Sequence, residues 1–291
     1  MHTLKTLWKA FVKIIWSGKN KNSTQNGCKN IETYSQNTSS YNVDLKEVKV
    51  KKSTVGYWIN KYELNNLMKY SKSKYNSNYF KIINSKEKAY IVGFLAGDGH
   101  LSKEGAIVCS VQLSDKNVLD FIKNEIGGQV RINDEVNRSK KKFPKARWQT
   151  YDNELYENLY QLLKGRLKEE RELPYLNKRL NIYLIQGFMD AEGCFTCGRR
   201  KDQNRFWQKV SFTSKNKMLK DLINMLNEFG IKDINLRQKG EEKCHVFEVC
   251  DKNRVLRIIE LLYKDNDFII MDRKKEKAIK IYNHYKEELD D

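Results

Sequence analysis

Two stretches of the sequence, YIVGFLAGDGH at residues 90–100 and YLIQGFMDAEGCF at residues 183–195, share one pattern. Each is an apolar run of helical length that ends in an acid followed by glycine. Small residues recur four positions apart in both stretches: Gly93 with Gly97, and Gly187 with Ala191. Residues four apart lie on one face of a helix. Removing side-chain bulk from that face predicts two helices that pack against each other with their backbones unusually close.

The acids Asp98 and Glu192 occupy matching places in the two stretches. If the helices pair side by side, both carboxylates emerge at the same end, which is the C-terminal end and carries a partial negative charge. Two carboxylates there repel each other as well as the helix dipoles. Divalent cations would relieve this repulsion. Carboxylate oxygens, together with phosphate oxygens of a substrate, are suitable ligands for Mg²⁺ or Mn²⁺. The pattern therefore predicts a metal site for phosphodiester hydrolysis.

The remainder of the chain repeats as well, which indicates a fold built from two copies. VQLSDKN at residues 111–117 returns as VSFTSKN at 210–216, and WQTYDN at 148–153 returns as FEVCDK at 247–252. Hydrophobic periodicity within each copy predicts helix, two strands, helix, two strands and helix. We expect an α+β protein with two αββαββα domains, residues 85–176 and 177–291, related by a pseudo-two-fold axis.

Residues 1–84 form a separate basic extension, part of which has the polar composition of a linker. Within it, residues 50–66 resemble a helix-turn-helix recognition helix, because Ser53 and Thr54 precede a segment with Trp58 and Ile59 on one face. The whole chain has a formal net charge of +18. Such an excess favours a polyanionic partner, most simply nucleic acid. No apolar run approaches the roughly 20 residues of a membrane-spanning helix.

The six cysteines argue for a reducing compartment, since their spacing is not that of a secreted disulfide framework. Cys194 and Cys197 could suggest zinc. They lie three apart in an expected strand, where alternation points them to opposite faces. We therefore expect no zinc site.

The paired IVGFLAGDG and IQGFMDAEG resemble the twin motifs of the LAGLIDADG homing endonucleases, in their single-chain form with two copies. The resemblance covers residues 85–288. It implies that each domain lays four strands in the DNA major groove, and that cleavage crosses the minor groove. It also implies that Asp98 and Glu192 bind the metal ions, aided by the backbone carbonyls of Gly97 and Ala191.

Further catalytic residues are implied by the same resemblance. A polar side chain on the second strand often joins the water network, and Gln112 fits that place, whereas the second half has Ser211. A basic residue near the end of each half commonly approaches the scissile phosphate. Lys178 is the candidate in the first half, and Lys274, or its neighbour Arg273, in the second.

Base recognition would fall to side chains on the DNA-facing side of the strands. Arg suits guanine and Gln suits adenine by bidentate geometry. The candidates are Gln112, Arg131, Arg147 and Gln149 in the first half, and Lys209, Arg237 and Glu248 in the second.

Three functions are open to this scaffold: a site-specific DNA endonuclease for intron homing, an RNA-binding intron maturase, and a regulator that binds DNA without cutting it. The two acids argue against the regulator, since a pure binder gains nothing from a carboxylate pair. We expect a monomer that acts on double-stranded DNA, with intron RNA as the alternative partner. We also expect an intracellular location, in a bacterium or phage-infected cell or in an organelle matrix.

Overall fold

The computed structural model describes residues 75–136, 142–200, 205–240, 244–264, 268 and 270–290. The helix-turn-helix-like segment at 50–66 lies outside the described residues. The boundary predicted at 176/177 stays a prediction.

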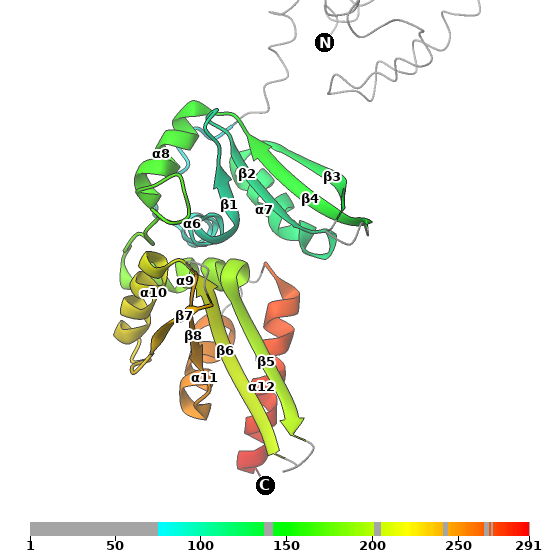
Figure 1. Cartoon of the computed structure of the whole chain (residues 1–291), viewed down its shortest axis with the longest axis vertical. Coiled ribbons are helices and arrows are strands. Elements are labelled where there is room, and N and C mark those ends of the chain that lie inside the picture. The colour runs from blue at the N-terminus through cyan, green and yellow to red at the C-terminus, as the bar shows by residue number, and fades with distance from the viewer. Residues whose placement is uncertain are drawn as a thin grey trace, which may run out of the picture. The chain divides into compact units, whose positions relative to one another are not determined.

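The first copy has the predicted order of elements (Figure 1). Its parts are α6 (Lys86–Asp98), β1 (Gly99–Leu101), β2 (Ile107–Gln112), the 3-10 turn η3 (Leu113–Asp115), α7 (Lys116–Ile126), β3 (Gln129–Val136), β4 (Lys142–Thr150) and α8 (Asn153–Leu163). The turn η3 was not expected, and it separates the second strand from the helix that follows.

The second copy repeats this order and adds a last helix. Its parts are α9 (Lys178–Glu192), β5 (Gly193–Arg200), β6 (Arg205–Ser214), α10 (Asn216–Glu228), β7 (Leu236–Lys239), β8 (Cys244–Val249), α11 (Lys252–Ile259), the π-helical turn η4 (Glu260–Lys264) and α12 (Asp272–Asp290). The α+β class and the doubled αββαββα plan are thereby confirmed. Among the helices in the described residues, none is both long and apolar enough to cross a membrane.

Each copy forms one antiparallel four-stranded sheet with the same strand order, β1-β2-β4-β3 and β5-β6-β8-β7. One face of each sheet enters the core, where Cys109 of β2, Trp148 of β4, Phe212 of β6 and Phe247 of β8 are buried. The buried Trp148 donates from Nε1 to the Gly127 carbonyl at 2.8 Å, so its one polar atom is satisfied. The opposite face of each sheet is left for other contacts.

The two motif helices α6 and α9 begin at side-chain caps. Ser85 accepts a hydrogen bond from the Lys88 amide, and Asn177 accepts one from the Leu180 amide. Short polar side chains at this position satisfy amides that the first helical turn leaves unpaired. Helix α6 is buried from Ala89 to Gly97, as a helix between two domains should be.

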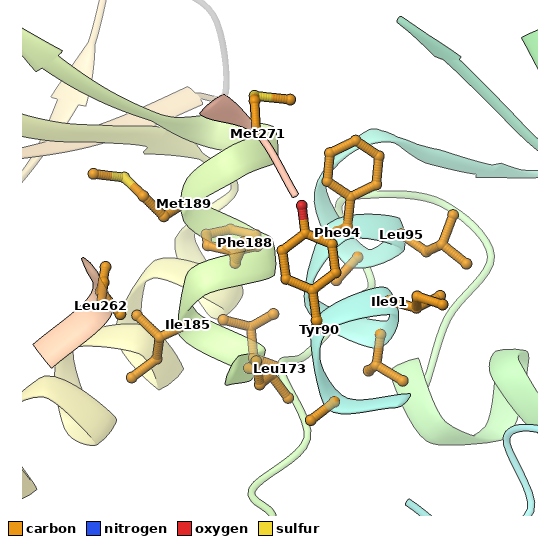
Figure 2. Packing of buried hydrophobic residues seen from close by; sticks show 14 of the residues in the cluster. Tyr90, Ile91, Phe94, Leu95, Leu173, Ile185, Phe188, Met189, Leu262 and Met271 are labelled. Carbon is orange, nitrogen blue, oxygen red and sulfur yellow. The ribbon is translucent and has the colours of Figure 1, made fainter. Parts of the chain in front are cut away.

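The pairing of α6 with α9 is as close as the small residues predict. A Cβ added to Gly93 would lie 2.0 Å from the Leu184 carbonyl oxygen, and one added to Gly187 would lie 2.0 Å from the Tyr90 carbonyl oxygen. Only glycine fits at these two crossing points. Figure 2 shows the side chains that pack around this pair, among them Phe94 from one helix and Phe188 from the other.

Candidate active site

Both motif helices end at their acids, Asp98 and Glu192, and the next residue of each opens a strand. The helix ends meet here. A Cβ on Gly97 would lie 2.5 Å from the Ala191 Cβ and 2.9 Å from the Glu192 Cγ. The sequence prediction that Asp98 and Glu192 emerge together is therefore confirmed.

The environment of both carboxyls disfavours negative charge. Burial, and next the nearby Glu192 carboxylate, raise the pKa of Asp98 to about 6. Burial raises the pKa of Glu192 as well, although Lys168 opposes the shift. Neither helix has a basic residue in its last turn. In the part of the chain that the structure describes, no hydrogen bond or ion pair reaches the Asp98 carboxylate.

This donor set fits a hard divalent cation. It offers carboxylate oxygens from two elements that the helix pairing brings together, and burial raises the pKa of both carboxyls despite the cations nearby. Among the described residues there is no group of three His, Cys, Asp or Glu side chains that could hold a metal alone. A cation here would need further oxygen ligands from water or a phosphate. Mg²⁺ in proteins usually has such ligands beside one or two carboxylates.

Two lysines lie beside the acids. Lys168, from the loop after α8, forms an ion pair with Glu192. Lys274, at the start of α12, is buried and donates to the Met189 carbonyl at 3.1 Å and to the Gly193 carbonyl. The charge of Lys274 also opposes the rise in the pKa of Asp98 that burial causes. The structure thus brings the second-half candidate, Lys274, to the acids.

Arg171 is the first-half equivalent of Lys274. It is only 2% exposed. Its guanidinium donates to the carbonyls of Leu95, Ala96 and Gly99 at 3.3, 3.1 and 2.8 Å. Lys274 binds the matching carbonyls of the other helix, so each motif helix ends against a buried cation that compensates its C-terminal charge.

The prediction for Lys178 is wrong. Lys178 is the first residue of α9, and its ammonium lies over the Phe229 ring at 5.6 Å. Glu192 closes the same helix fourteen residues later, about 21 Å away at 1.5 Å per residue. Lys168 takes the place near the acids instead. Sequence reasoning missed Lys168 and Arg171, because they lie in an irregular loop that follows no periodic pattern.

The sheet register also changes the assignment of Gln112. Gly99 pairs with Cys109 and Gly193 pairs with Phe212, so the positions beside the acids are Ser110 and Thr213. Gln112 lies two residues farther along the same face of β2, about 7 Å away. Alignment of the two copies by sequence makes Ser211 the equivalent of Gln112 in the second copy. The extra turn η3 in the first copy shifts the register.

The predicted DNA-facing residues of the first half share one sheet face. Arg131 pairs with Arg147, Arg147 with Ser110, and Gln149 with Val108, while Gln112 stands on the same face two residues beyond Ser110. Arg131, Arg147 and Gln112 are exposed, and Gln149 is half-buried.

The residues of the second half gather around a hollow of about 370 Å³ lined by Lys209, Arg237 and Glu248. Glu248 accepts from Lys209 at 2.7 Å and also pairs with Arg237. These ion pairs lower the pKa of Glu248, with the Lys209 hydrogen bond as the largest cause. The carboxylate therefore stays ionised and holds both basic side chains over the sheet.

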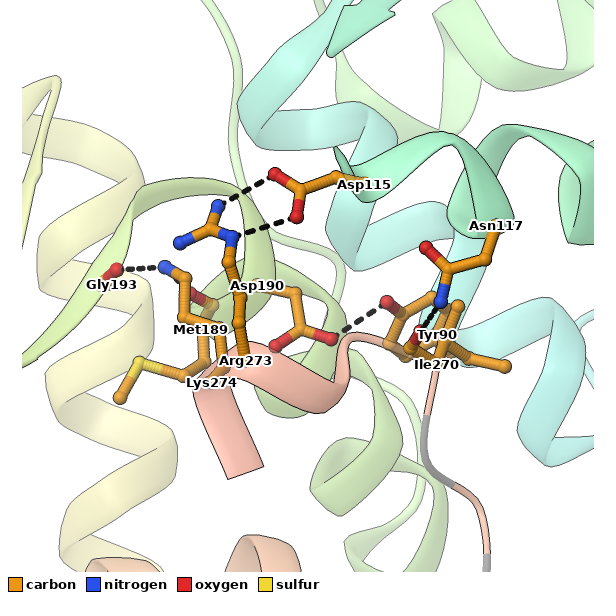
Figure 3. A network of polar contacts seen from close by, with 9 residues as sticks. All are labelled: Tyr90, Asp115, Asn117, Met189, Asp190, Gly193, Ile270, Arg273 and Lys274. Carbon is orange, nitrogen blue, oxygen red and sulfur yellow. Dashed lines mark hydrogen bonds and ion pairs between the residues drawn. The ribbon is translucent and has the colours of Figure 1, made fainter. Parts of the chain in front are cut away.

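A buried polar network lies beside the acids and joins the two halves (Figure 3). Asp190 accepts hydrogen bonds from the hydroxyls of Tyr90 at 2.7 Å and Tyr263 at 3.2 Å. Burial raises the pKa of Asp190 to about 7. The matching residue of the first motif is Ala96, so this network exists on one side of the pseudo-two-fold axis.

Cys194 and Cys197 lie in strand β5, opposite Ser211 and Gln208 respectively. An odd separation along a strand directs their side chains to opposite faces.

A comparison with family models finds one match, to the LAGLIDADG endonuclease family, over residues 185–285. No curated protein matches the chain. Among solved structures, the meganuclease I-SmaMI bound to uncleaveable DNA is similar at 12% identity and a TM-score of 0.48, covering 70% of this chain and 92% of that one. I-AabMI bound to uncleaved DNA is similar at 15% identity and a TM-score of 0.45, covering 69% of this chain and 91% of that one. I-LtrWI bound to target DNA is similar at 16% identity and a TM-score of 0.43, covering 72% of this chain and 92% of that one.

The matched residues run from the second motif helix to α12. The first copy repeats the same elements in the same order and ends its motif helix at an equivalent acid. Residues 185–285 are therefore similar to the LAGLIDADG endonuclease family, and the first copy repeats their order of elements with a motif of its own.

Proposed function

We propose that this protein is a site-specific endonuclease that hydrolyses both strands of a DNA duplex with divalent metal ions, Mg²⁺ or Mn²⁺. The observation that carries the proposal is the meeting of Asp98 and Glu192 at the ends of two helices that cross at their glycines. The acids come one from each half. One acid for each strand of a duplex is the simplest assignment.

Bound divalent ions would supply an activated water and neutralise charge on the scissile phosphate. Asp98 and Glu192 would hold these ions, with the carbonyls of Gly97 and Ala191 as further oxygen donors. Lys168 and Lys274 would place positive charge beside the phosphates, which is where negative charge grows in the transition state. Their positions against the Glu192 carboxylate and the Gly193 carbonyl support these roles.

Substrate recognition would belong to the two sheet faces. The rows of Arg131 with Arg147, and of Lys209 with Arg237, supply the charge that attracts a phosphate backbone and the donors that read guanine. We further propose that the protein acts as a monomer and inside a cell, where duplex DNA is present, in a bacterium, a phage-infected cell or an organelle.

The test is cleavage of a duplex library with randomised sequence, with sequencing of the cut ends. With Mg²⁺, the wild-type chain should cut both strands at one recurring sequence. Asp98→Asn and Glu192→Gln should each abolish double-strand cleavage and keep binding to the recovered site. Glu157→Gln, an exposed acid on α8 that accepts a hydrogen bond from Gln161, is the matched control. Full cutting by the double variant of Asp98 and Glu192 would refute the proposal.

A further inference from the structure

The two acids of the candidate active site are paired unequally with basic side chains. The Glu192 carboxylate forms an ion pair with Lys168, which reaches across from the first half, and the Glu192 side chain is only 13% exposed. Among the residues that the structure describes, no basic side chain forms an ion pair with Asp98. A cation that binds Glu192 must therefore compete with a lysine, whereas a cation that binds Asp98 need not.

The repeat does not supply a second lysine of this kind. Arg171 and Lys274 are equivalent, since each donates to backbone carbonyls at the end of the motif helix of its own half. Three residues before them stand Lys168 and Met271 respectively. Met271 is only 3% exposed. The second half therefore has a buried methionine at the place where the first half has Lys168.

The other cations near Asp98 have different partners. Lys274 donates to two carbonyls, and Arg273 donates two hydrogen bonds to Asp115 at 2.7 and 2.8 Å (Figure 3). Both act on Asp98 through their charge alone. Neither side chain competes directly for the Asp98 oxygens.

The loop that carries Lys168 is fixed on both sides of this residue. Glu169 pairs with Lys215, the N-cap residue of α10, at 2.8 Å. The Leu173 amide donates to Asp221 of α10 at 2.9 Å. A loop that is already ordered lowers the entropy cost of holding a lysine against its partner. The pair of Lys168 with Glu192 therefore differs from a surface ion pair between two mobile side chains, which contributes little.

We propose that Lys168 occupies the Glu192 carboxylate in place of a divalent cation, so that the two acids bind metal in order, Asp98 first and Glu192 second. The proposal rests on the metal-dependent function proposed above. Lys168 must leave Glu192 before this carboxylate can bind a cation, and the lost ion pair weakens that binding. Once released, Lys168 is free to approach the scissile phosphate.

The effect should be large enough to measure. An opposite charge close to a carboxylate changes the affinity of that carboxylate for a proton by about tenfold or more, and a competing metal ion should be affected in the same sense. At limiting cation concentration, the strand served by Asp98 would therefore be cut before the strand served by Glu192.

The experiment measures Mn²⁺ binding to the full chain without DNA, from the loss of the electron paramagnetic resonance signal of free Mn²⁺. Each acid is examined alone, because Glu192→Gln leaves Asp98 and Asp98→Asn leaves Glu192. The chain that keeps Asp98 should bind Mn²⁺ about tenfold or more tightly than the chain that keeps Glu192.

Lys168→Met is then added to each single-acid chain. Lys168 is 35% exposed, so its replacement should leave the fold intact. The dissociation constant for Mn²⁺ should fall about tenfold in the chain that keeps Glu192, and change by less than about threefold in the chain that keeps Asp98, which Lys168 does not contact. Lys168→Arg retains the charge and should leave the Glu192 chain unchanged.

Lys164→Met is the matched control. Lys164 lies in the same loop and pairs with Glu172 at 2.7 Å, so its replacement removes one positive charge without breaking a contact to either acid. Added to the chain that keeps Glu192, it should leave the dissociation constant for Mn²⁺ unchanged.

An equal gain in affinity in both single-acid chains on Lys168→Met, or an equal gain on Lys164→Met, would show a general effect of charge and overturn the proposal. No gain in the chain that keeps Glu192 would overturn it too. All these results leave the metal-dependent function standing. That function fails separately if the wild-type chain and both single-acid chains bind no Mn²⁺, and the order of binding proposed here then fails with it.

Discussion

The crossing of α6 and α9 makes Gly187→Ala the most informative single substitution. The added Cβ would lie 2.0 Å from the Tyr90 carbonyl oxygen and 2.9 Å from the Phe94 amide nitrogen, whereas real Cβ atoms essentially never approach closer than 3.0 Å. The helices must therefore move apart by at least 1.0 Å at this point. Both obstructing atoms belong to the backbone, so no side-chain rotation relieves the clash.

Overpacking of a core by a methyl group destabilises by about 1–3 kcal/mol, and a rigid backbone clash belongs at the upper end. For a unit the size of Ser73–Asp291, about 3 kcal/mol lowers the unfolding temperature by roughly 6–12 °C. Thermal unfolding followed by circular dichroism measures this shift. Separation of the helices also displaces Glu192 from Asp98, so cleavage of the recovered target should be lost at temperatures where the variant is folded.

Gly198→Ala is the control, because Gly198 lies in strand β5 and its added Cβ meets only the Trp207 side chain, at 3.0 Å. That variant should stay within about 1 kcal/mol of the wild type, since the loss of chain entropy in the unfolded state offsets a small readjustment. An unfolding temperature for Gly187→Ala equal to that of Gly198→Ala would show that the close crossing is not present.

Four further variants test the surroundings of the acids. Arg171→Met leaves three carbonyls without their buried donor and should lower the free energy of unfolding by about 3 kcal/mol in urea titrations. Lys168→Met should slow cleavage by about 100-fold or more, whereas Lys178→Met should change the rate by less than about twofold, as single-turnover kinetics would show. In metal-free protein, the pKa values of about 6 for Asp98 and about 7 for Asp190 exceed those of the unfolded chain, so the folded state binds protons more tightly. The unfolding temperature should therefore rise as pH falls from about 8 towards about 5, and Asp190→Asn should flatten this rise; a profile in which the variant keeps the full slope would contradict the assignment.

The parts of the fold that sequence alone predicted are those governed by repetition and periodicity. The doubled motif predicted the two copies. The small residues Gly93 and Gly187 predicted the helix pairing, because small residues at a four-residue spacing clear one helix face for close packing. The acids followed from that pairing. Alternation along the strands also placed Arg131 and Arg147 on one face correctly.

The parts that failed depend on irregular backbone. Lys168 and Arg171 reach the motif helices from a loop, and nothing in their local sequence distinguishes them from solvated basic residues. Gln112 was placed by matching residues 111–117 to residues 210–216 with no gap between strand and helix, whereas η3 adds a turn there in the first copy only and shifts the strand register. Such shifts become visible only once hydrogen-bond partners between strands are known.

The backbone contact between α6 and α9 has a consequence for how readily this scaffold can change its target. The spacing of the two acids is set by main-chain atoms at Gly93 and Gly187, which no side-chain substitution on the sheets touches. Replacing the exposed residues of β3, β4 or β7 would thus alter which bases are contacted while the reactive centre keeps its dimensions. Recognition and chemistry can then diverge independently, and a new specificity can be sought by mutating one sheet face at a time.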